Sequence, residues 1–400
     1  MLKKIISFPL YYLLSALKIF IKRDTIILGT SSYYRYAGNT RYLYYYLCKN
    51  TEYQIFWLTE SKEIMDHLDN IGLTYLSNSN ILKKLYYTLK CKIVIDSGTG
   101  YYDLFGLLSR DNKVVKISTM HGSGPKLSVE RSDDIDNSIK LIKKINTFNC
   151  VSFCTEYSQR VIGVNQLFLP YSKTKLFGLP KIDILLDTKH INNVKAKKKW
   201  TKQIFNQDKI DKYKVIYYAP TFRSESSKLP IFTLKNFDIN EFNNFLALNN
   251  IYFIYTYHSM SSFTSSIINL SHIKHYGISI DPLFDNMDLM IEADMMVGDY
   301  STLATEFSIL NKPQLFIMND YDDVNKTKGF AEDLRETLPG KEIDSYNDLI
   351  NTISFALSNP SNYLNKYQSK INLLHKRYVG DLNGSSREKF KSYIDTLMIQ

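Results

Sequence analysis

The amino-acid sequence predicts an α/β protein of two domains, and three observations support this fold class. Short apolar runs alternate with longer amphipathic runs from Asp24 onward, which is typical of parallel β-strands joined by helices. A chain of 400 residues with 44% apolar content exceeds the length at which a single hydrophobic core keeps growing. A polar stretch rich in Lys and Asn, residues 190–212, separates two sets of these runs and indicates a domain boundary.

The central strands are expected at eight apolar runs. Those of the first half are TIILGTS, QIFWLT, CKIVIDS and KVVKIST, at residues 25–31, 54–59, 91–97 and 113–119. Those of the second half are YKVIYYAP, IYFIYTY, DMMVG and PQLFIM, at residues 213–220, 251–257, 294–298 and 313–318. Helical spacing marks residues 40–50, residues 81–90 and most of 344–400.

These patterns place a first α/β domain at residues 24–185 and a second at 213–380. Residues 381–400 are expected to form a C-terminal helix that packs back on the first domain. Ligands of open parallel sheets bind beyond the carboxyl ends of the strands. The functional site is therefore expected in the cleft between the two domains.

Residues 1–23 form the one membrane-like segment. The apolar stretch 5–21 has two basic residues on each side, and it contains Pro9 and Lys18. It is shorter than the ~20 apolar residues that span a bilayer, so an interfacial anchor with snorkelling lysines fits best. A spanning helix and a buried helix stay open, whereas a cleaved signal peptide is disfavoured because no small-x-small site follows.

Charge and cysteine content limit the partners and the compartment. A net charge of +10 favours anionic partners, which include phospholipid surfaces, nucleic acid and phosphorylated substrates. Most aromatic residues lie inside apolar runs rather than beside Arg and Lys in Gly-rich tracts, which argues against a platform for single-stranded nucleic acid. The four cysteines form no CxxC pair, so we expect reduced thiols in the cytoplasm and no zinc site.

The sharpest local motif is MHGSGPK, residues 120–126, directly after the predicted strand 113–119. His121 at a strand end is a potential base, and the glycines starting at Gly122 make a tight turn that exposes backbone N–H groups. Lys126 adds a cation for an anionic substrate. The alternative is a Gly-rich turn that the histidine merely caps.

Two further motifs follow strands of the second half. In YAPTFR, Arg223 is suited to bidentate contact with a phosphate. The alternative is an ordinary surface Arg in a loop, which would have the same sequence pattern. His258 in IYTYHSM brings a second histidine to the same edge of the sheet. A lone His in that place is more often structural than catalytic.

The third motif, GDYSTLATEF, follows the predicted strand 294–298. Asp299, Ser301 and Thr302 precede a helix whose first turn offers hydroxyl groups, backbone N–H groups and the positive end of the helix dipole to a phosphate. Glu306 lies one turn beyond Thr302 and could accept hydrogen bonds from ribose hydroxyls. An ordinary helix cap is the alternative.

Some cofactor signals are absent from the sequence. It has no GxGxxG after the first strand and no GxxxxGK[ST], so it lacks the fingerprints of dinucleotide-binding and P-loop proteins. No Asp-x-Asp pair stands in a metal-binding context. We expect neither a metal nor another cofactor.

Taken in order, these motifs resemble the CDP-glycerol glycerophosphotransferase family, enzymes that prime or polymerise teichoic acids and related phosphodiester polymers. The resemblance spans nearly the whole chain. It rests on the motifs above together with GNTRYLYYYL, FGLPKID, DPLFDNMDLMIEA, NKPQLFIMNDYDD and GDLNGSSREK.

This resemblance implies a GT-B-like fold, with two Rossmann-like domains facing a cleft and an N-terminal helix that associates with the membrane. It implies peripheral attachment to the cytoplasmic face of the cell membrane, with anionic lipid as a partner and no nucleic acid. The donor would be CDP-glycerol or CDP-ribitol, bound by the second domain, and no cofactor is needed. The acceptor, on the side of the first domain, would be an undecaprenyl-diphosphate-linked saccharide, and CMP would be released.

The resemblance also implies roles for individual residues. His121 would remove the proton of the acceptor hydroxyl, and His258 would assist at the phosphate. The other implied roles are donor phosphate binding by Arg223, Ser301 and Thr302, orientation and ribose contact by Asp299 and Glu306, and acceptor-side contact by Gly122 and Lys126.

Two other functions stay open. A glycosyltransferase of the same fold would bring a nucleotide sugar to the same helix N-terminus, and the transferred group distinguishes it. A non-catalytic membrane scaffold is the other alternative, although it would not require the two histidines, His121 and His258, that follow predicted strands.

Overall fold

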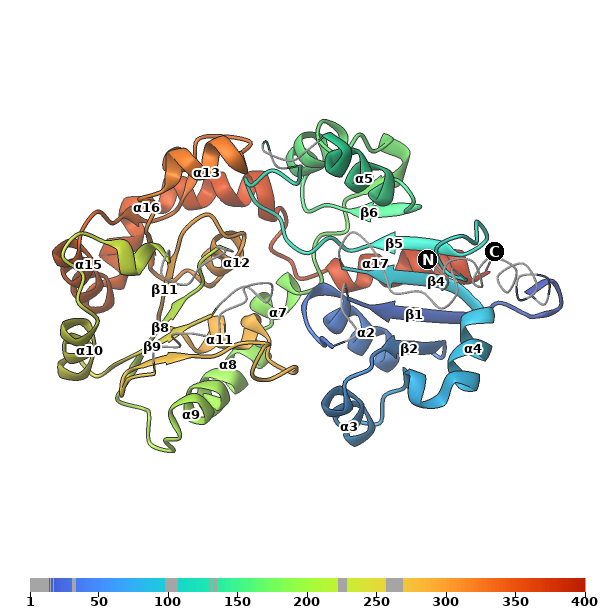
Figure 1. Cartoon of the computed structure of the whole chain (residues 1–400), viewed down its shortest axis with the longest axis horizontal. Helices are drawn as coiled ribbons and strands as arrows, with labels where there is room; N and C mark the ends of the chain where they lie inside the picture. The colour runs from blue at the N-terminus through green and yellow to red at the C-terminus, as the bar shows by residue number, and fades with distance from the viewer. Residues whose placement is uncertain are drawn as a thin grey trace.

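The computed structural model describes residues 14, 16, 18–30, 34–97, 107–129, 131, 135–221, 229–256 and 269–399. Two parallel β-sheets, each covered by helices, lie side by side along the long axis of the molecule (Figure 1). The predicted α/β class with two Rossmann-like halves is confirmed.

The first sheet has the strand order β3-β2-β1-β4-β5-β6-β7, and every pair of neighbours is parallel. The chain therefore reverses its direction of travel across the sheet between β1 and β4. The strands are β1 (Thr25–Gly29), β2 (Gln54–Leu58), β3 (Tyr75–Leu76), β4 (Cys91–Asp96), β5 (Val115–Ser118), β6 (Cys150–Ser152) and β7 (Thr174–Lys175).

The second sheet repeats this topology in the order β10-β9-β8-β11-β12-β13, again with all neighbours parallel. Its reversal lies between β8 and β11. The strands are β8 (Lys214–Tyr218), β9 (Ile251–Tyr255), β10 (Ile273–His275), β11 (Met295–Gly298), β12 (Gln314–Phe316) and β13 (Lys341–Glu342).

The eight strands predicted from apolar runs are all present. The five that the sequence did not reveal are two or three residues long, too short to carry a periodic pattern. Helices connect the strands as parallel pairing requires. In the first half they are α2 (Gly38–Asn50), α3 (Lys62–Asn70), α4 (Ile81–Leu89), α5 (Ile135–Ile145), α6 (Glu156–Ser158) and a π-helix at Gln159–Val164.

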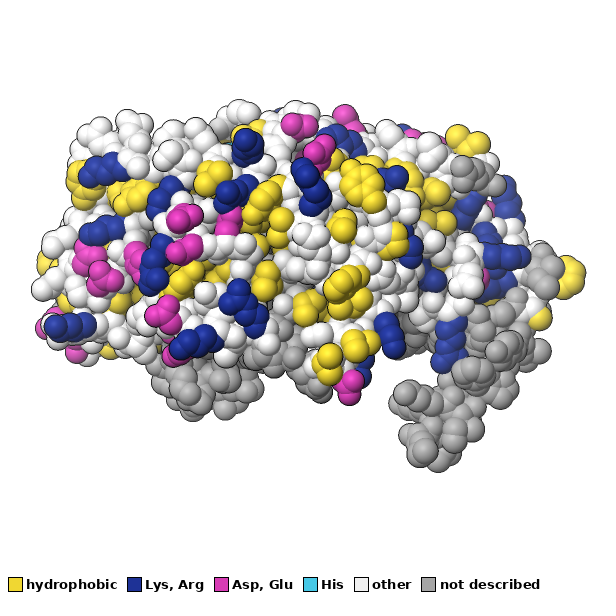
Figure 2. Space-filling model, turned by 90° about the horizontal axis from the view of Figure 1, so that it is seen from above, with side chains coloured by type: hydrophobic (Ala, Val, Ile, Leu, Met, Phe, Trp, Pro, Cys, Tyr) yellow, Lys and Arg dark blue, Asp and Glu magenta, His cyan; other side chains and the backbone are white. Residues whose placement is uncertain are grey.

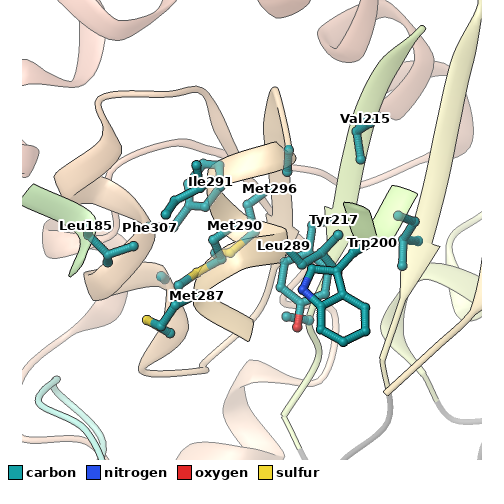
Figure 3. Packing of buried hydrophobic residues seen from close by; sticks show 14 of the residues in the cluster. Leu185, Trp200, Val215, Tyr217, Met287, Leu289, Met290, Ile291, Met296 and Phe307 are labelled. Carbon is teal, nitrogen blue, oxygen red and sulfur yellow. The ribbon is translucent and has the colours of Figure 1, made fainter. Parts of the chain in front are cut away.

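The polar stretch 190–212 is largely helical. Helices α7 (Ile182–Leu186), α8 (Thr188–Lys197) and α9 (Lys199–Phe205) cover it and the residues before it. Trp200 and Leu185 belong to the same buried cluster as Tyr217 of β8 and Met290 (Figure 3). The Lys and Asn residues face outward, so this segment is packed against the second half in spite of its polar composition.

The second half is covered by α10 (Ile239–Leu248), α11 (Asn286–Glu292), α12 (Leu303–Phe307), α13 (Tyr321–Thr327), α14 (Leu334–Thr337), α15 (Tyr346–Ser358) and α16 (Pro360–Leu374). After a π-helix at His375–Val379, the chain returns to the first half as α17 (Ser386–Ile399) (Figure 1). Phe390 of α17 contacts Phe177 with ring centroids 5.0 Å apart, and Ile394 belongs to the same core cluster.

Most of the predicted membrane segment, 1–23, lies outside the described residues. Lys18 is described, and its ammonium donates to the Leu107 carbonyl at 2.6 Å and to Asp111 at 2.7 Å. Its side chain is 1% exposed, so Lys18 is an internal ion-pair partner and does not snorkel toward lipid. Among the residues that are described, no helix is both long and apolar enough to cross a bilayer.

Candidate functional site

A cavity of about 400 Å³ lies between the two halves, at the point where each sheet reverses its strand order. The loops after β1 and β4 contribute Thr30 and Ser97 to its lining. The loops after β8 and β11 contribute Thr221 and residues 300–303. Because both reversal points open at carboxyl ends of parallel strands, the fold itself creates this binding crevice.

The motif 120–126 forms one wall of the cavity. His121 is exposed and follows β5 by three residues, and Lys126 lines the same cavity. A Cβ atom on Gly122 would lie 2.7 Å from Oγ1 of Thr302. A glycine is therefore required at this position because the turn approaches the second half too closely for a side chain. This requirement is separate from any role of its N–H group.

The residues after β11 form the opposite wall. Asp299 is fully buried, and its carboxylate accepts hydrogen bonds from the Thr221 backbone N–H at 2.9 and 3.0 Å and from the Thr221 hydroxyl at 2.7 Å. It also accepts from the backbone N–H of Tyr300 at 2.6 Å. These bonds join the loop after β8 to the loop after β11, so Asp299 fixes the positions of both loops although it does not itself line the cavity.

Ser301 and Thr302 both line the cavity, as the sequence predicts. The Ser301 hydroxyl accepts a hydrogen bond from the backbone N–H of Leu303 at 3.3 Å. The first turn of α12 starts here, since the N–H of Ala304 donates to the Ser301 carbonyl at 3.1 Å. The hydroxyl groups are thus placed at the start of a helix, where an anion is favoured.

Glu306 does not lie where the sequence analysis expects it. Its side chain is 1% exposed, and its Oε1 atom lies 2.6 Å from Nζ of Lys181. Burial raises the pKa of this carboxyl group, and the neighbouring Lys181 opposes that rise. The predicted contact between Glu306 and a ribose does not fit this arrangement, because the carboxylate faces the Lys181 ammonium group and does not line the cavity.

A short backbone ladder fixes the two halves beside the cavity. Lys126 forms an antiparallel bridge with Phe330. The N–H of Ala331 donates to the Pro125 carbonyl at 2.8 Å, and the N–H of Leu127 donates to the Gly329 carbonyl at 3.2 Å. The end of the His121 motif is therefore tied directly to the second half.

Arg223 and His258 lie outside the described residues, so their roles stay predictions. The sequence analysis also assigned no role to several cavity residues. Among them is Asp285, which caps α11 by accepting from the N–H of Met287 at 2.8 Å and lies 3.5 Å from Arg41 of α2. The motifs GNTRY and FGLPKID were visible in the sequence, but their spacing gave no indication that they meet behind His121.

A second cavity, of about 230 Å³, opens beside His121 and is lined mainly by the first half, together with Thr302 of the second. Its lining is mostly apolar and includes Leu141 and Phe153. Cys154 also lines it, and burial raises the pKa of this thiol to about 12, so the sulfur is not a nucleophile at neutral pH. In the described part of the chain, no three His, Cys, Asp or Glu side chains are grouped to hold a metal ion.

Comparison with proteins of known structure identifies the same architecture elsewhere. The fold matches the wall teichoic acid polymerase TagF with a TM-score of 0.76 and 18% identity, covering 100% of this chain and 98% of that one. A TagF variant soaked with CDPG matches with a TM-score of 0.73. The GT-B-like fold expected from the sequence is therefore confirmed.

Sequence comparisons reach the same group of proteins. The chain is 25% identical to the teichoic acid glycerol-phosphate primase of Bacillus subtilis over 355 residues, 86% of this chain and 84% of that protein. It is 24% identical to the teichoic acid glycerol-phosphate transferase of Staphylococcus aureus over 97% of both chains. The model of the family described as CDP-glycerol:poly(glycerophosphate) glycerophosphotransferase matches residues 10–394, and the chain belongs to this enzyme family.

Proposed function

We propose that the chain transfers glycerol phosphate, or ribitol phosphate, from the CDP-activated polyol to an undecaprenyl-diphosphate-linked saccharide in the synthesis of teichoic acid or a related capsular polymer. Family membership supports the CDP-polyol donor and the transfer. The lipid-linked acceptor and the release of CMP go beyond it and are part of the proposal.

The observation that carries the proposal is the shared cavity. His121 lies on its first-half wall, while Ser301 and Thr302 lie on its second-half wall. A donor held by the second wall would present its transferable phosphate toward the histidine. Phosphoryl-type transfer needs mainly this positioning together with charge stabilisation.

In the proposed reaction, an acceptor hydroxyl oxygen attacks the donor phosphorus that carries the polyol. His121 takes the proton of that hydroxyl. The bond between this phosphorus and the bridging oxygen breaks, and CMP leaves with the electron pair. Arg223 and His258 are proposed to bind the donor phosphates and the leaving group.

The charge of the cavity lining supports an anionic donor. Among the described residues that line it, Arg35 and Lys126 are cationic and Asp285 is anionic, while the ammonium of Lys181 lies 2.6 Å from the Glu306 carboxylate. A CDP-polyol carries two negative charges on its diphosphate. The excess of cations on the lining would therefore favour its binding and stabilise charge as CMP departs.

The decisive experiment measures nucleotide release by the purified protein from CDP-glycerol, CDP-ribitol, UDP-glucose and UDP-N-acetylglucosamine, each with a lipid-linked disaccharide. We expect CMP from one CDP-polyol, with a loss of about 1,000-fold in His121→Ala. His272→Ala is the matched control, because His272 precedes β10 at the amino edge of its sheet, away from the cavity. Release of UDP alone would contradict the proposal and favour a glycosyltransferase.

Peripheral attachment to the cytoplasmic face of an anionic membrane is part of the proposal. In Figure 2, Asp and Glu side chains gather mainly over the second half, whereas Lys and Arg occur over both halves. The first half also exposes Ile135, Phe168 and Tyr171, which are 72%, 67% and 65% exposed. Vesicle co-sedimentation tests this: we expect binding to vesicles with anionic lipid that weakens at high salt, and equal binding to zwitterionic vesicles would contradict it.

A further inference from the structure

The backbone just before His121 adopts a conformation that needs external support. Met120 has a φ of 54°, in the left-handed region that side chains with a Cβ atom disfavour. The residue is also buried, with 8% of its surface exposed. Contacts from outside the loop must therefore hold it in place.

Asn39 supplies the first of these contacts. Its amide nitrogen donates to the Met120 carbonyl at 2.6 Å, and its amide oxygen accepts from the backbone N–H of Lys181 at 3.2 Å. Asn39 is 1% exposed and lies at the start of α2. With both ends of the amide engaged, its orientation is fixed, and it links Met120 to the segment that contains Lys181.

Lys181 supplies the second contact. Its ammonium group donates to the His121 carbonyl at 2.7 Å and lies 2.6 Å from Oε1 of Glu306. The two side chains are 8% and 1% exposed. A buried ammonium without a counter-ion is strongly disfavoured, so the contact with Glu306 holds Lys181 in place against His121.

The same contacts cross between the two halves. Glu306 belongs to α12, in the second half, whereas His121 belongs to the first. A Cβ atom on Gly122 would lie 3.6 Å from the Glu306 carboxylate, so the carboxylate lies directly behind the loop. The position of the His121 backbone therefore depends on how α12 is seated against the first half.

We infer that Lys181 is a positioning residue for His121, supported by Asn39 and by Glu306 from the opposite half. The inference rests on the proposed function, since it assigns Lys181 to the orientation of the catalytic base. Lys181 holds the His121 carbonyl, and the same ammonium contacts Glu306 of the second half, so this support spans both halves. This couples docking of the halves to the orientation of the base.

The test separates this role from simple stabilisation. Lys181→Met alone leaves the Glu306 carboxylate buried without a partner, and the variant loses stability for that reason alone. The double variant Lys181→Met with Glu306→Met removes both charges and keeps the volumes similar, so its thermal stability should recover. The matched control removes the partly exposed pair Lys391 and Asp395 on α17 in the same way.

We expect kcat for CMP release to be about 100-fold lower in the double variant, with KM for the CDP-polyol changed by less than about 3-fold. The control pair should keep wild-type kinetics. Recovery of wild-type kcat together with stability would overturn the inference, because Lys181 and Glu306 would then act on stability alone. A rise in KM at unchanged kcat would also overturn it.

A readout without substrate keeps the inference distinct from the proposed function. Amide hydrogen exchange of the peptide covering residues 115–125 should become at least about 10-fold faster in the double variant, while the peptides of α17 stay unchanged. Unchanged exchange at 115–125 would overturn the inference even if activity fell. If the wild-type protein releases no CMP from any CDP-polyol, the proposed function fails, and the exchange experiment alone decides whether Lys181 holds the loop.

Discussion

The two walls of the cavity are supported in different ways. The second-half wall, residues 299–302, is held by Asp299, whose partners Thr221 and Tyr300 belong to the same half. The first-half wall, the loop 119–124, is held by side chains from α2, from the segment before α7 and from α12 of the other half. One wall is thus self-contained, whereas the other depends on docking of the two halves.

This difference predicts different kinetic consequences. A change in the self-contained wall should alter donor binding and the stability of the second half. A change in the dependent wall should alter the orientation of His121 and so the rate of the chemical step. Substitutions on the two walls can therefore test whether docking and donor binding are separate properties.

The largest effect is expected at Gly122, where the dependent wall meets the other half. In Gly122→Ala the new Cβ atom would lie 2.7 Å from Thr302 Oγ1 and 3.2 Å from Thr302 Cβ, so the loop and α12 must separate. We expect kcat to fall about 100-fold, because His121 moves relative to the bound donor. Steady-state CMP release measures this.

Gly277→Ala is the matched control for this prediction. Gly277 lines the same cavity, but a Cβ atom there would meet its nearest neighbour, Thr256, at 3.8 Å, an ordinary contact. Its kcat should stay within about 2-fold of wild type. Equal losses in the two variants would mean that the cavity tolerates no added methyl group and that the contact between the walls has no special role.

The second-largest effect among these substitutions is expected at Asp299. In Asp299→Asn the side chain keeps its shape, but an amide group replaces a carboxylate that accepts three hydrogen bonds from Thr221. We expect a loss of about 2 kcal/mol in the free energy of unfolding and a rise in KM for the donor of about 10-fold, with kcat nearly unchanged. Urea denaturation and donor titration check the two parts, and a fall in kcat at constant KM would contradict the assignment of this wall to the donor.

Local patterns in the sequence predicted the long buried strands and the motifs that follow them. Strand β1, Thr25–Gly29, is buried along its whole length, and such continuous apolar runs are readable without a structure. His121 and Ser301 were expected at one site because each follows a strand, and the carboxyl ends of the strands of both domains were expected to face the same cleft. Both conclusions need only local patterns and the rule that ligands bind beyond the carboxyl ends of parallel strands.

Local sequence patterns could not predict the contacts that form only when the two halves come together. Helical spacing placed Glu306 one turn after Thr302, on the same face, and a ribose contact was the natural expectation. Its actual partner, Lys181, is distant in sequence and meets it only after both halves have folded and docked. The snorkelling expected of Lys18 was also wrong because its partner, Asp111, is distant in sequence and forms a buried ion pair with it.

A smaller effect is expected at Ser301. Its hydroxyl accepts one long hydrogen bond, 3.3 Å, from Leu303 N–H, so it contributes little to the fold. Ser301→Ala should raise KM for the donor about 5-fold through loss of a single hydrogen bond to phosphate, with kcat and thermal stability close to wild type. If the hydroxyl served only as a helix cap, stability would fall and KM would not change.

The smallest effect concerns pH and the second half. Burial lowers the pKa of His275 to about 4, and β10, which contains it, ends two residues before Gly277, a second-half residue that lines the same cavity. The unfolded chain, in which a histidine has a pKa near ~6.5, binds the proton more readily than the folded chain. The contribution of His275 to stability is therefore complete above pH ~6.5 and falls as the pH drops toward ~4.

We expect the free energy of unfolding to fall by about 1 kcal/mol more between pH ~7 and pH ~5 in the wild type than in His275→Gln, allowing for solvent screening. Because His275 lies in β10 and contributes to none of the supports of the dependent wall, this loss should appear first as weaker donor binding. It should not begin as a slower chemical step. Parallel stability curves for the two proteins over that range would show that His275 titrates normally, and a fall in kcat before any rise in KM would show that the two walls respond to acid as one unit.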